Sequence, residues 1–142
     1  MKKATDYTTL LREHGFKATA LRIAILEALE VSRTPLTVAK IVRKVRKHSA
    51  DVESVYRALA AFVQEDIVRA IPLGSNSLSY EFVRDQHGHH IVCTSCAVVE
   101  AIPFCVRSIE LNAKDKSKLF KSISGHTLSF AGTCKKCARA VR

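Results

Sequence analysis

The sequence predicts an α+β (α/β) fold in two parts, an N-terminal winged helix-turn-helix followed by a small α/β domain with a structural zinc site. Up to about residue 66 the apolar side chains recur at helical spacing, whereas residues 67–83 alternate like the strands of a hairpin. The last third of the chain then carries two C-x-x-C pairs. We therefore predict a winged helix over residues 1–83, a hinge over 84–87 and an α/β domain over 88–142.

Four helices are expected in the first part. The first carries Leu10 and Leu11 and ends near Gly15, since glycine favours helix C-termini. The second is the apolar stripe of "LRIAILEALEV", with Thr19 as its N-cap. Thr37 can cap the third, which points Val38, Ile41, Val42 and Val45 inward. Asp51 begins the fourth, over residues 52–65.

The remaining elements are strands with one helix among them. "IVRAIPL" and "LSYEFV" form the hairpin around a turn at residues 74–77, "GSNS". Beyond the hinge, "HHIVC" and "VVEAI" are short strands, and residues 106–123 form a helix. "HTLSFAG" alternates polar and apolar residues like a half-buried last strand.

The composition favours a polyanionic partner. A formal charge of +10 on 142 residues can serve solubility alone, but Lys and Arg also displace counterions from phosphates. Five basic residues follow one another with no acid between them: Lys40, Arg43, Lys44, Arg46 and Lys47. The opening residues lack the apolar core of a signal peptide and no later run matches a membrane span, so we expect a cytoplasmic protein without a membrane partner.

The cysteines predict a metal site. Cys93 and Cys96 form one C-x-x-C pair and Cys134 and Cys137 the other, and two such pairs can complete a tetrahedral four-thiolate zinc site. Because four thiolates leave the zinc ion no open coordination position, we expect the site to have a structural role. A pair of dithiols or an iron–sulfur cluster is the rival interpretation, and isolated buried thiols are the simplest one. Cys105 has no cysteine left to pair with and is expected in the core.

Three histidines precede the first cysteine pair in "DQHGHHIVC". In an extended segment His87 and His89 share one face and His90 takes the other, which predicts either two metal sites or one site and one structural histidine. Candidate partners are His126, Glu110 and Glu81. Imidazoles with a carboxylate suit a borderline divalent ion such as zinc, ferrous iron or nickel, and solvated histidines are the alternative.

The arrangement resembles the ferric uptake regulator (Fur) family of metal-responsive repressors over nearly the whole chain. The resemblance rests on "FKATALRIAILEAL", "ESVYRALAAFVQEDIV", "HGHHIVCTSC" and "GHTLSFAGTCKKC", in that order. It implies a homodimer, held by the α/β domain as a dimerisation domain, that binds double-stranded operator DNA when a regulatory metal is loaded. It also implies repression of metal-uptake or stress genes.

The resemblance further implies which residues bind metal. Cys93, Cys96, Cys134 and Cys137 match structural zinc ligands, and His87, His89, Glu110 and His126 match a second metal site. Glu81 and His90 match part of a regulatory site at the hinge. The family often adds a histidine near Arg33 and Thr34, and this sequence has none between His14 and His48. The regulatory ion is expected to be Zn²⁺ or Fe²⁺, with Mn²⁺ or Ni²⁺ also compatible.

The same resemblance places the helix after Asp51 in the major groove. Tyr56 can offer its ring to a thymine methyl and Arg57 can reach a guanine or a phosphate, with Ser54 on the same face. Lys17, Thr19 and Arg22 suit backbone or minor-groove contacts. Metal at the hinge would fix the orientation of two winged helices for successive half-sites.

Two other functions fit parts of the sequence. One is a small zinc-dependent hydrolase, with His87, His89 and His126 around the metal and Glu110 as base. The chain lacks an H-E-x-x-H helix, a glycine-rich phosphate loop and a recognisable substrate pocket, so we do not expect an enzyme with a small organic substrate. The other is a constitutive DNA-binding or metal-buffering protein whose histidines switch nothing.

Overall fold

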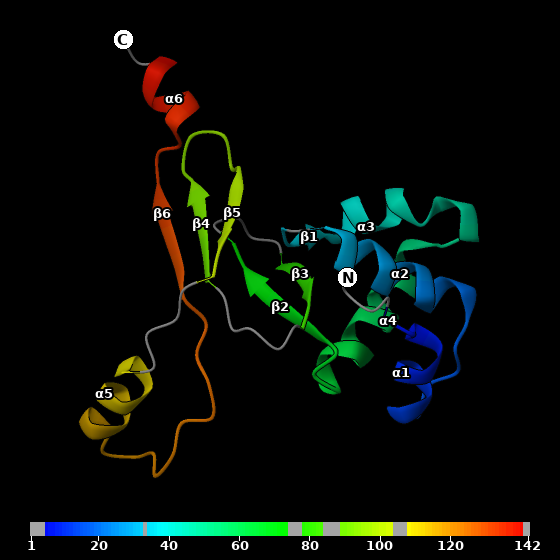
Figure 1. The fold of residues 1–142 in the computed structure, drawn as a ribbon, viewed down its shortest axis with the longest axis horizontal. Coiled ribbons are helices and arrows are strands. Elements are labelled where there is room, and N and C mark those ends of the chain that lie inside the picture. Colours follow the sequence, from blue (N-terminus) through cyan, green and yellow to red (C-terminus); the bar gives the residue numbers. More distant parts are fainter. Residues whose placement is uncertain (1–4, 33, 74–77, 84–88, 104–107, 141–142) are drawn as a thin grey trace. The chain divides into compact units, whose positions relative to one another are not determined.

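The computed structural model describes residues 5–32, 34–73, 78–83, 89–103 and 108–140 (Figure 1). The chain divides into two compact units, Met1–Val83 and Arg84–Arg142. Some predictions fall outside the described residues: the hairpin turn at 74–77, the hinge at 84–87, and the roles of His87 and Cys105.

The first unit is a winged helix-turn-helix, as predicted. Its helices are α1 (Tyr7–Glu13), α2 (Ala20–Val31), α3 (Val38–Lys44) and α4 (Val52–Gln64), with a short 3₁₀ helix, η1 (Arg46–His48), between the last two. The strands β1 (Leu36–Thr37), β2 (Val68–Pro72) and β3 (Leu78–Phe82) form an antiparallel sheet in the order β1-β3-β2. Only β1 and η1 were not expected from the sequence.

The predicted N-caps begin three of these helices. The side chain of Thr19 accepts a hydrogen bond from the backbone N–H of Arg22 at 3.3 Å, and Thr37 accepts one from Lys40 at 3.4 Å. Asp51 accepts from the N–H of Ser54 at 2.7 Å. These bonds satisfy N–H groups that have no partner inside the helix, which fixes where each helix starts.

An apolar core fills the first unit. Phe62 of α4 is fully buried, and its ring meets that of Phe16 edge to face at a centroid distance of 5.6 Å. The other side chains with almost no exposure come from all four helices and the sheet: Leu11, Ile25, Leu26, Leu29, Ile41, Val45, Val55, Leu59 and Val68. This core sets the position of α4 against α3 and the sheet.

The second unit is a three-stranded sheet with two helices. Its elements are β4 (His89–Cys93), β5 (Val99–Ile102), α5 (Ser108–Lys116), β6 (Ser129–Gly132) and α6 (Lys135–Ala140). The sheet order is β5-β4-β6, with β4 antiparallel to β5 and parallel to β6 (Figure 1). In the described part of the chain, no helix has the length and apolar character that crossing a membrane requires.

Three details of this unit differ from the sequence prediction. The helix expected to reach residue 123 stops at Lys116, because the hydroxyl of Ser117 accepts from the N–H groups of Leu119 and Phe120 and turns the chain. The last strand begins at Ser129 rather than at residue 126. The helix α6 was not predicted, since its six residues carry no apolar stripe.

The second unit has almost no buried apolar side chain. Among its described residues, those that are buried are His89, His90 and Cys93, with exposed fractions of 1%, 3% and 4%. All three are residue types that bind metal ions. Hydrophobic burial, which usually stabilises a domain, therefore contributes little to this unit as a single copy.

We expect Phe62→Ala to lower the free energy of unfolding of the first unit by about 3–5 kcal/mol, since it leaves a cavity beside Phe16. The matched control Val31→Ala, at a position that is 74% exposed on α2, should stay within about 0.5 kcal/mol of the parent. Urea unfolding followed by far-ultraviolet circular dichroism measures both. A loss below about 1 kcal/mol for the Phe62 variant would contradict its place in the core.

Candidate metal centres and DNA-binding surface

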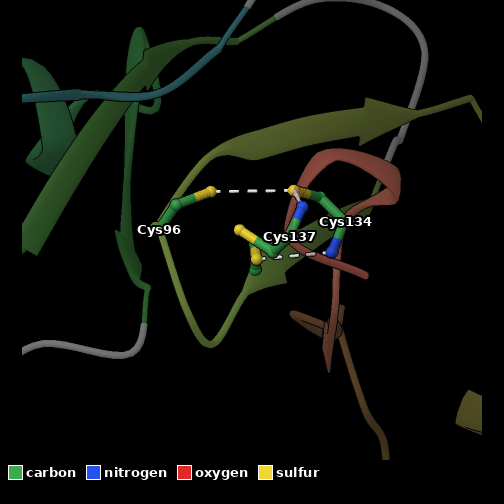
Figure 2. Close-up of side chains that lie close together, drawn as sticks. Cys96, Cys134 and Cys137 are labelled. Carbon is green, nitrogen blue, oxygen red and sulfur yellow. Dashed lines mark hydrogen bonds between the residues drawn. The ribbon is translucent and has the colours of Figure 1, made fainter. Parts of the chain in front are cut away.

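The four cysteines of the two C-x-x-C pairs lie together in the second unit. Cys93 ends β4. Cys96 lies in the turn before β5, Cys134 directly before α6 and Cys137 within it (Figure 2). Their sulfur atoms are all within 4.8 Å of one another. The cluster thus joins the β4–β5 turn to the C-terminal helix, which is about forty residues further along the chain.

The spacing of the sulfur atoms fits a tetrahedral zinc ion. Zn–S bonds of about 2.3 Å at tetrahedral angles require ligand sulfur atoms roughly 3.8 Å apart. The Sγ atoms of Cys96 and Cys134 are separated by 3.7 Å. Four thiolates would complete the coordination of the ion, so such a site is structural and leaves no position for a substrate.

Hydrogen bonds from backbone N–H groups lower the pKa of two of the thiols, which favours the thiolate form that binds metal. The N–H of Cys134 donates to Sγ of Cys93 at 3.3 Å, and this bond is the main reason why the pKa of the Cys93 thiol is lowered to about 6. The N–H of Cys137 donates to Sγ of Cys134 at 3.4 Å and likewise lowers the pKa of that thiol. A hydrogen bond to Cys134 raises the pKa of Cys137 to about 12.

A tight turn positions the first cysteine pair. Ala97 adopts a left-handed conformation with φ of 58°, and its N–H donates to the carbonyl of Cys93 at 2.9 Å. The N–H of Cys93 in turn donates to the carbonyl of Val98 at 2.9 Å. The N–H of Thr94 donates to the carbonyl of Gly132 at 2.8 Å and fixes the turn to β6, two residues before Cys134. Local backbone bonding therefore aims both cysteine pairs at one point.

A second group of candidate ligands lies on the same sheet. The Nε2 atoms of His89 and His126 are 3.2 Å apart, and their rings are 5.0 Å apart between centroids. Two imidazole nitrogens bound at about 2.0–2.1 Å to one tetrahedral ion lie roughly 3.3 Å apart, so this pair has the spacing of two ligands of the same ion. His126 is 37 residues from His89 in the chain, and the fold brings them together.

Glu110 of α5 belongs to this group through His126. Its Oε1 accepts a hydrogen bond from Nδ1 of His126 at 2.9 Å, on the ring nitrogen that faces away from His89. A carboxylate in this place fixes the tautomer of a histidine and leaves the lone pair of Nε2 for a metal ion. The structure therefore brings Glu110 into contact with His126, and both belong to the metal site that the family resemblance implies.

The two candidate hinge ligands lie in different units. Glu81 lies on β3, and its Oε1 is 3.6 Å from Nη1 of Arg69, its cross-strand partner on β2. His90 lies on β4 and is buried, next to His89 in the chain. Sequence reasoning overlooked Arg69, although a cross-strand neighbour of opposite charge is a common arrangement in a hairpin. A metal ion at Glu81 has to compete with this guanidinium.

The predicted recognition residues lie on one side of α4. Tyr56 is 52% exposed although most large apolar side chains of this unit are buried. Arg57 is exposed and its Nε lies 3.9 Å from Glu53, one helical turn earlier. Ser54 is half-buried, and its hydroxyl donates to Asp51 at 2.8 Å. Tyr56 and Arg57 are therefore available to a ligand of this helix.

The second predicted group lies at the start of α2. Lys17 and Thr19 are exposed. Arg22 donates from Nη1 to the carbonyl of Lys17 at 3.0 Å, and its guanidinium lies 5.2 Å from the ring centroid of Phe16. These two contacts hold the positive charge of Arg22 beside the N-terminus of α2, where it can meet an anion without first being ordered.

The fold and its four-thiolate cluster define a winged-helix, DNA-binding regulator of transcription with a structural zinc site. The model of the ferric uptake regulator family matches residues 13–131. The ferric uptake regulation protein of Campylobacter jejuni is 28% identical over 92% of this chain and 85% of its own length. The transcriptional regulator FurA of Mycobacterium tuberculosis is 36% identical over 75% of this chain and 73% of its own.

A solved structure of the ferric uptake regulator of Francisella tularensis with iron superimposes with a TM-score of 0.70. It is 26% identical, and the match covers 87% of this chain and 96% of that one. The chain belongs to the ferric uptake regulator family of metal-responsive transcriptional regulators.

Zinc uptake by the cysteine cluster should depend steeply on pH. At pH 7 the Cys93 thiol, with a pKa of about 6, is largely ionised, whereas Cys137, with a pKa of about 12, keeps its proton until zinc displaces it. Each proton released raises the apparent zinc affinity about tenfold per pH unit. Below pH 6 Cys93 is protonated as well, so the dependence becomes steeper.

The measurement is competition for zinc between the reduced, metal-stripped chain and a chromophoric chelator between about pH 6.5 and about pH 8.5. The exposed Ser95→Ala variant, in the same turn, should show the same pH dependence as the parent. A zinc affinity that is independent of pH would show that zinc displaces no thiol proton.

Proposed function

We propose that this protein is a homodimeric repressor of metal-uptake or metal-homeostasis genes and that a divalent metal ion at His89 and His126 controls its binding to operator DNA. The observation that carries this proposal is the approach of the two Nε2 atoms to 3.2 Å, with Glu110 on the far side of His126. Three residues of metal-binding type, spread over β4, α5 and the segment before β6, converge at one point.

The ligand set favours a borderline ion. Neutral imidazoles suit Zn²⁺ and Fe²⁺, and Mn²⁺ or Ni²⁺ are compatible with the same residues. We propose His89 and His126 as direct ligands, Glu110 as the carboxylate that orients His126, and His87 as a further ligand because it precedes His89 by two residues in the sequence. Bound there, the ion would fasten α5 and the segment before β6 to β4.

The proposal also assigns a role to the two candidate metal ligands at the hinge. Glu81 and His90 would bind a second ion, and its coordination would fix the orientation of the winged helix relative to the dimer. Because the guanidinium of Arg69 already neutralises Glu81 at 3.6 Å, we propose that this site fills only after the His89 and His126 site. The pair is half-buried and its nearest charged atoms are 3.6 Å apart, so a divalent ion, with its higher charge, can displace Arg69.

DNA recognition is assigned to α4 and to the start of α2. The exposed Tyr56 and Arg57 would reach base edges and phosphates in the major groove, with Ser54 beside them. Lys17, Thr19 and Arg22 would contact the backbone or the minor groove. Operator binding together with reduced, metal-binding thiols suits a protein of the cytoplasm.

The homodimer is supported by the surface of the second unit. This unit buries little apolar surface, yet it exposes several large apolar side chains that a second copy could cover. Their exposed fractions are 53% for Val98, 63% for Leu111, 90% for Leu119, 69% for Phe120 and 41% for Phe130. A second copy that covered them would supply the hydrophobic burial that the single unit lacks.

Removing the proposed metal ligand should remove the metal response. For zinc-replete protein, we expect one of Zn²⁺, Fe²⁺, Mn²⁺ or Ni²⁺ to tighten operator binding by the parent at least about tenfold, a typical allosteric coupling, and His89→Ala to abolish this gain. His14→Ala, which removes a histidine of the first unit that contacts Glu65, should respond like the parent. The operator is one that the parent selects from a random duplex library.

Fluorescence anisotropy of labelled operator, with zinc content checked by mass spectrometry, measures the response. Operator binding that is equally tight with and without every ion would contradict metal control and favour a constitutive zinc-stabilised DNA-binding protein. By linkage, the effective ion should also bind more tightly to the parent when the operator is present.

The recognition residues should affect specificity. Arg57→Gln removes the guanidinium from the exposed side of α4, and we expect it to weaken operator binding by about 1–3 kcal/mol and to reduce the ratio of operator to scrambled-duplex affinity. Arg12→Gln, which removes an exposed arginine of α1, is the charge-matched control and should leave the ratio unchanged. An unchanged ratio for the Arg57 variant would exclude it from base recognition.

A further inference from the structure

A stripe of basic side chains runs along α3 and η1, outside the residues assigned to DNA recognition above. Its members are spaced so that they share the solvent side of these two elements, and we name them the basic stripe: Lys40, Arg43, Lys44, Arg46 and Lys47. All five are exposed, whereas Val38, Ile41 and Val45 on the other side of the same segment are buried. The fold therefore turns every cation of this segment towards solvent.

These cations have no acidic neighbours. No acidic residue occurs between Glu30 and Asp51, and within the described part of the chain no ion pair or hydrogen bond joins a side chain of the basic stripe to a carboxylate. Elsewhere in the same unit two arginines do have such partners, since Arg57 lies near Glu53 and Arg69 near Glu81. The basic stripe is thus an uncompensated patch of positive charge.

The basic stripe also decides the charge of its unit. Residues 1–83 contain thirteen basic and nine acidic residues, a net charge of +4. Without the five cations of the basic stripe the same unit would carry a net charge of −1. A DNA-binding unit with a negative net charge would be repelled by phosphates, and these few neighbouring residues contribute five of the thirteen positive charges that prevent this.

Helix stability explains only part of the pattern. Arg43 and Lys44 lie in the last turn of α3, where cations complement the helix dipole. Lys40 lies a turn before them, and Arg46 and Lys47 lie in η1, beyond the end of α3. The dipole therefore gives no reason for three of the five charges, and a polyanionic ligand accounts for all of them.

The position of the basic stripe indicates which polyanion it binds. The segment packs beside the recognition helix, because α3 contacts α4 and η1 ends three residues before the N-cap Asp51 (Figure 1). From Lys40 to Lys47 the segment is roughly 10 Å long, and the same length of duplex carries about six phosphate charges. A protein on one side of the duplex can reach about half of them.

We propose that the basic stripe is a second DNA-contact surface, which binds the phosphate backbone beside the groove entered by α4 and supplies most of the sequence-independent affinity. The inference rests on the proposed function, because the duplex must be bound through α4. Contacts of this kind position the protein without reading the sequence. Affinity and specificity are then carried by different elements, α3 and η1 for the first and α4 for the second.

The test compares two triple variants of the full-length, zinc-replete chain. Lys40→Gln, Lys44→Gln and Lys47→Gln remove three charges from the basic stripe, and Lys114→Gln, Lys116→Gln and Lys118→Gln remove the same charge from exposed positions in the second unit. Binding to a labelled duplex of scrambled sequence is measured by anisotropy between about 50 and about 200 mM salt, and binding to the selected operator is measured in parallel.

We expect the stripe variant to bind the scrambled duplex about a hundredfold more weakly at moderate salt, with the slope of log affinity against log salt smaller by about 2–3. The ratio of operator to scrambled affinity should stay within about threefold of the parent, because phosphate contacts carry no sequence information. The second-unit variant should keep the parent slope.

Three outcomes would overturn the inference and leave the proposed function standing. Equal slopes for the parent and the stripe variant would show that these cations touch no phosphate. Equal losses in both triple variants would reduce the effect to net charge. A lower ratio of operator to scrambled-duplex affinity in the stripe variant would show that the basic stripe reads the sequence or that the variant is misfolded. If the parent itself bound no duplex with any metal ion, the proposed function would fail, and the inference with it.

Discussion

The second half of this protein depends on the four-thiolate cluster. A domain is ordinarily stabilised by apolar burial, but the described residues of this unit bury only His89, His90 and Cys93. The cluster ties the turn after β4 to the start of α6, directly after β6, the strand that pairs with β4, so we propose that it takes the place of a core. Binding free energy at such a site is also folding free energy, since no preformed site exists in the unfolded chain.

The two units therefore use different physical means for different tasks. The first unit is held by a continuous apolar core around Phe62, which keeps α4 and its exposed Tyr56 and Arg57 in a fixed place for the DNA contact proposed above. The second unit instead groups side chains of metal-binding type, and both groups, the four cysteines and the pair of His89 and His126, join segments far apart in the sequence. A unit of the second kind responds to metal ions more readily than one with a large core, which suits a regulator.

Much of this was predictable because the responsible patterns are local. Helix starts could be predicted from the N-cap side chains of Thr19, Thr37 and Asp51. The cysteine cluster could be predicted from the C-x-x-C spacing. The strand register, the contacts between distant side chains and the end of α5 could not be predicted, because hydrophobic periodicity does not determine them. The observed register pairs Pro72 with Leu78, whereas a loop of residues 74–77 implies a shift by one residue, which hid the pairing of Arg69 with Glu81. The contact of Glu110 with Nδ1 of His126 joins residues sixteen positions apart, and a contact of that range does not follow from local patterns. The end of α5 depended on one hydroxyl, that of Ser117.

The most direct test of this dependence is hydrogen–deuterium exchange of the whole chain before and after the zinc ion is removed from the cysteine cluster under reducing conditions. If the cluster organises the second unit, the amides of β4, β5 and β6 lose their protection while those of α2 and α4 keep theirs as an internal reference. Protection of the second unit that survived zinc removal would contradict this, and would show that its sheet is stable without the metal.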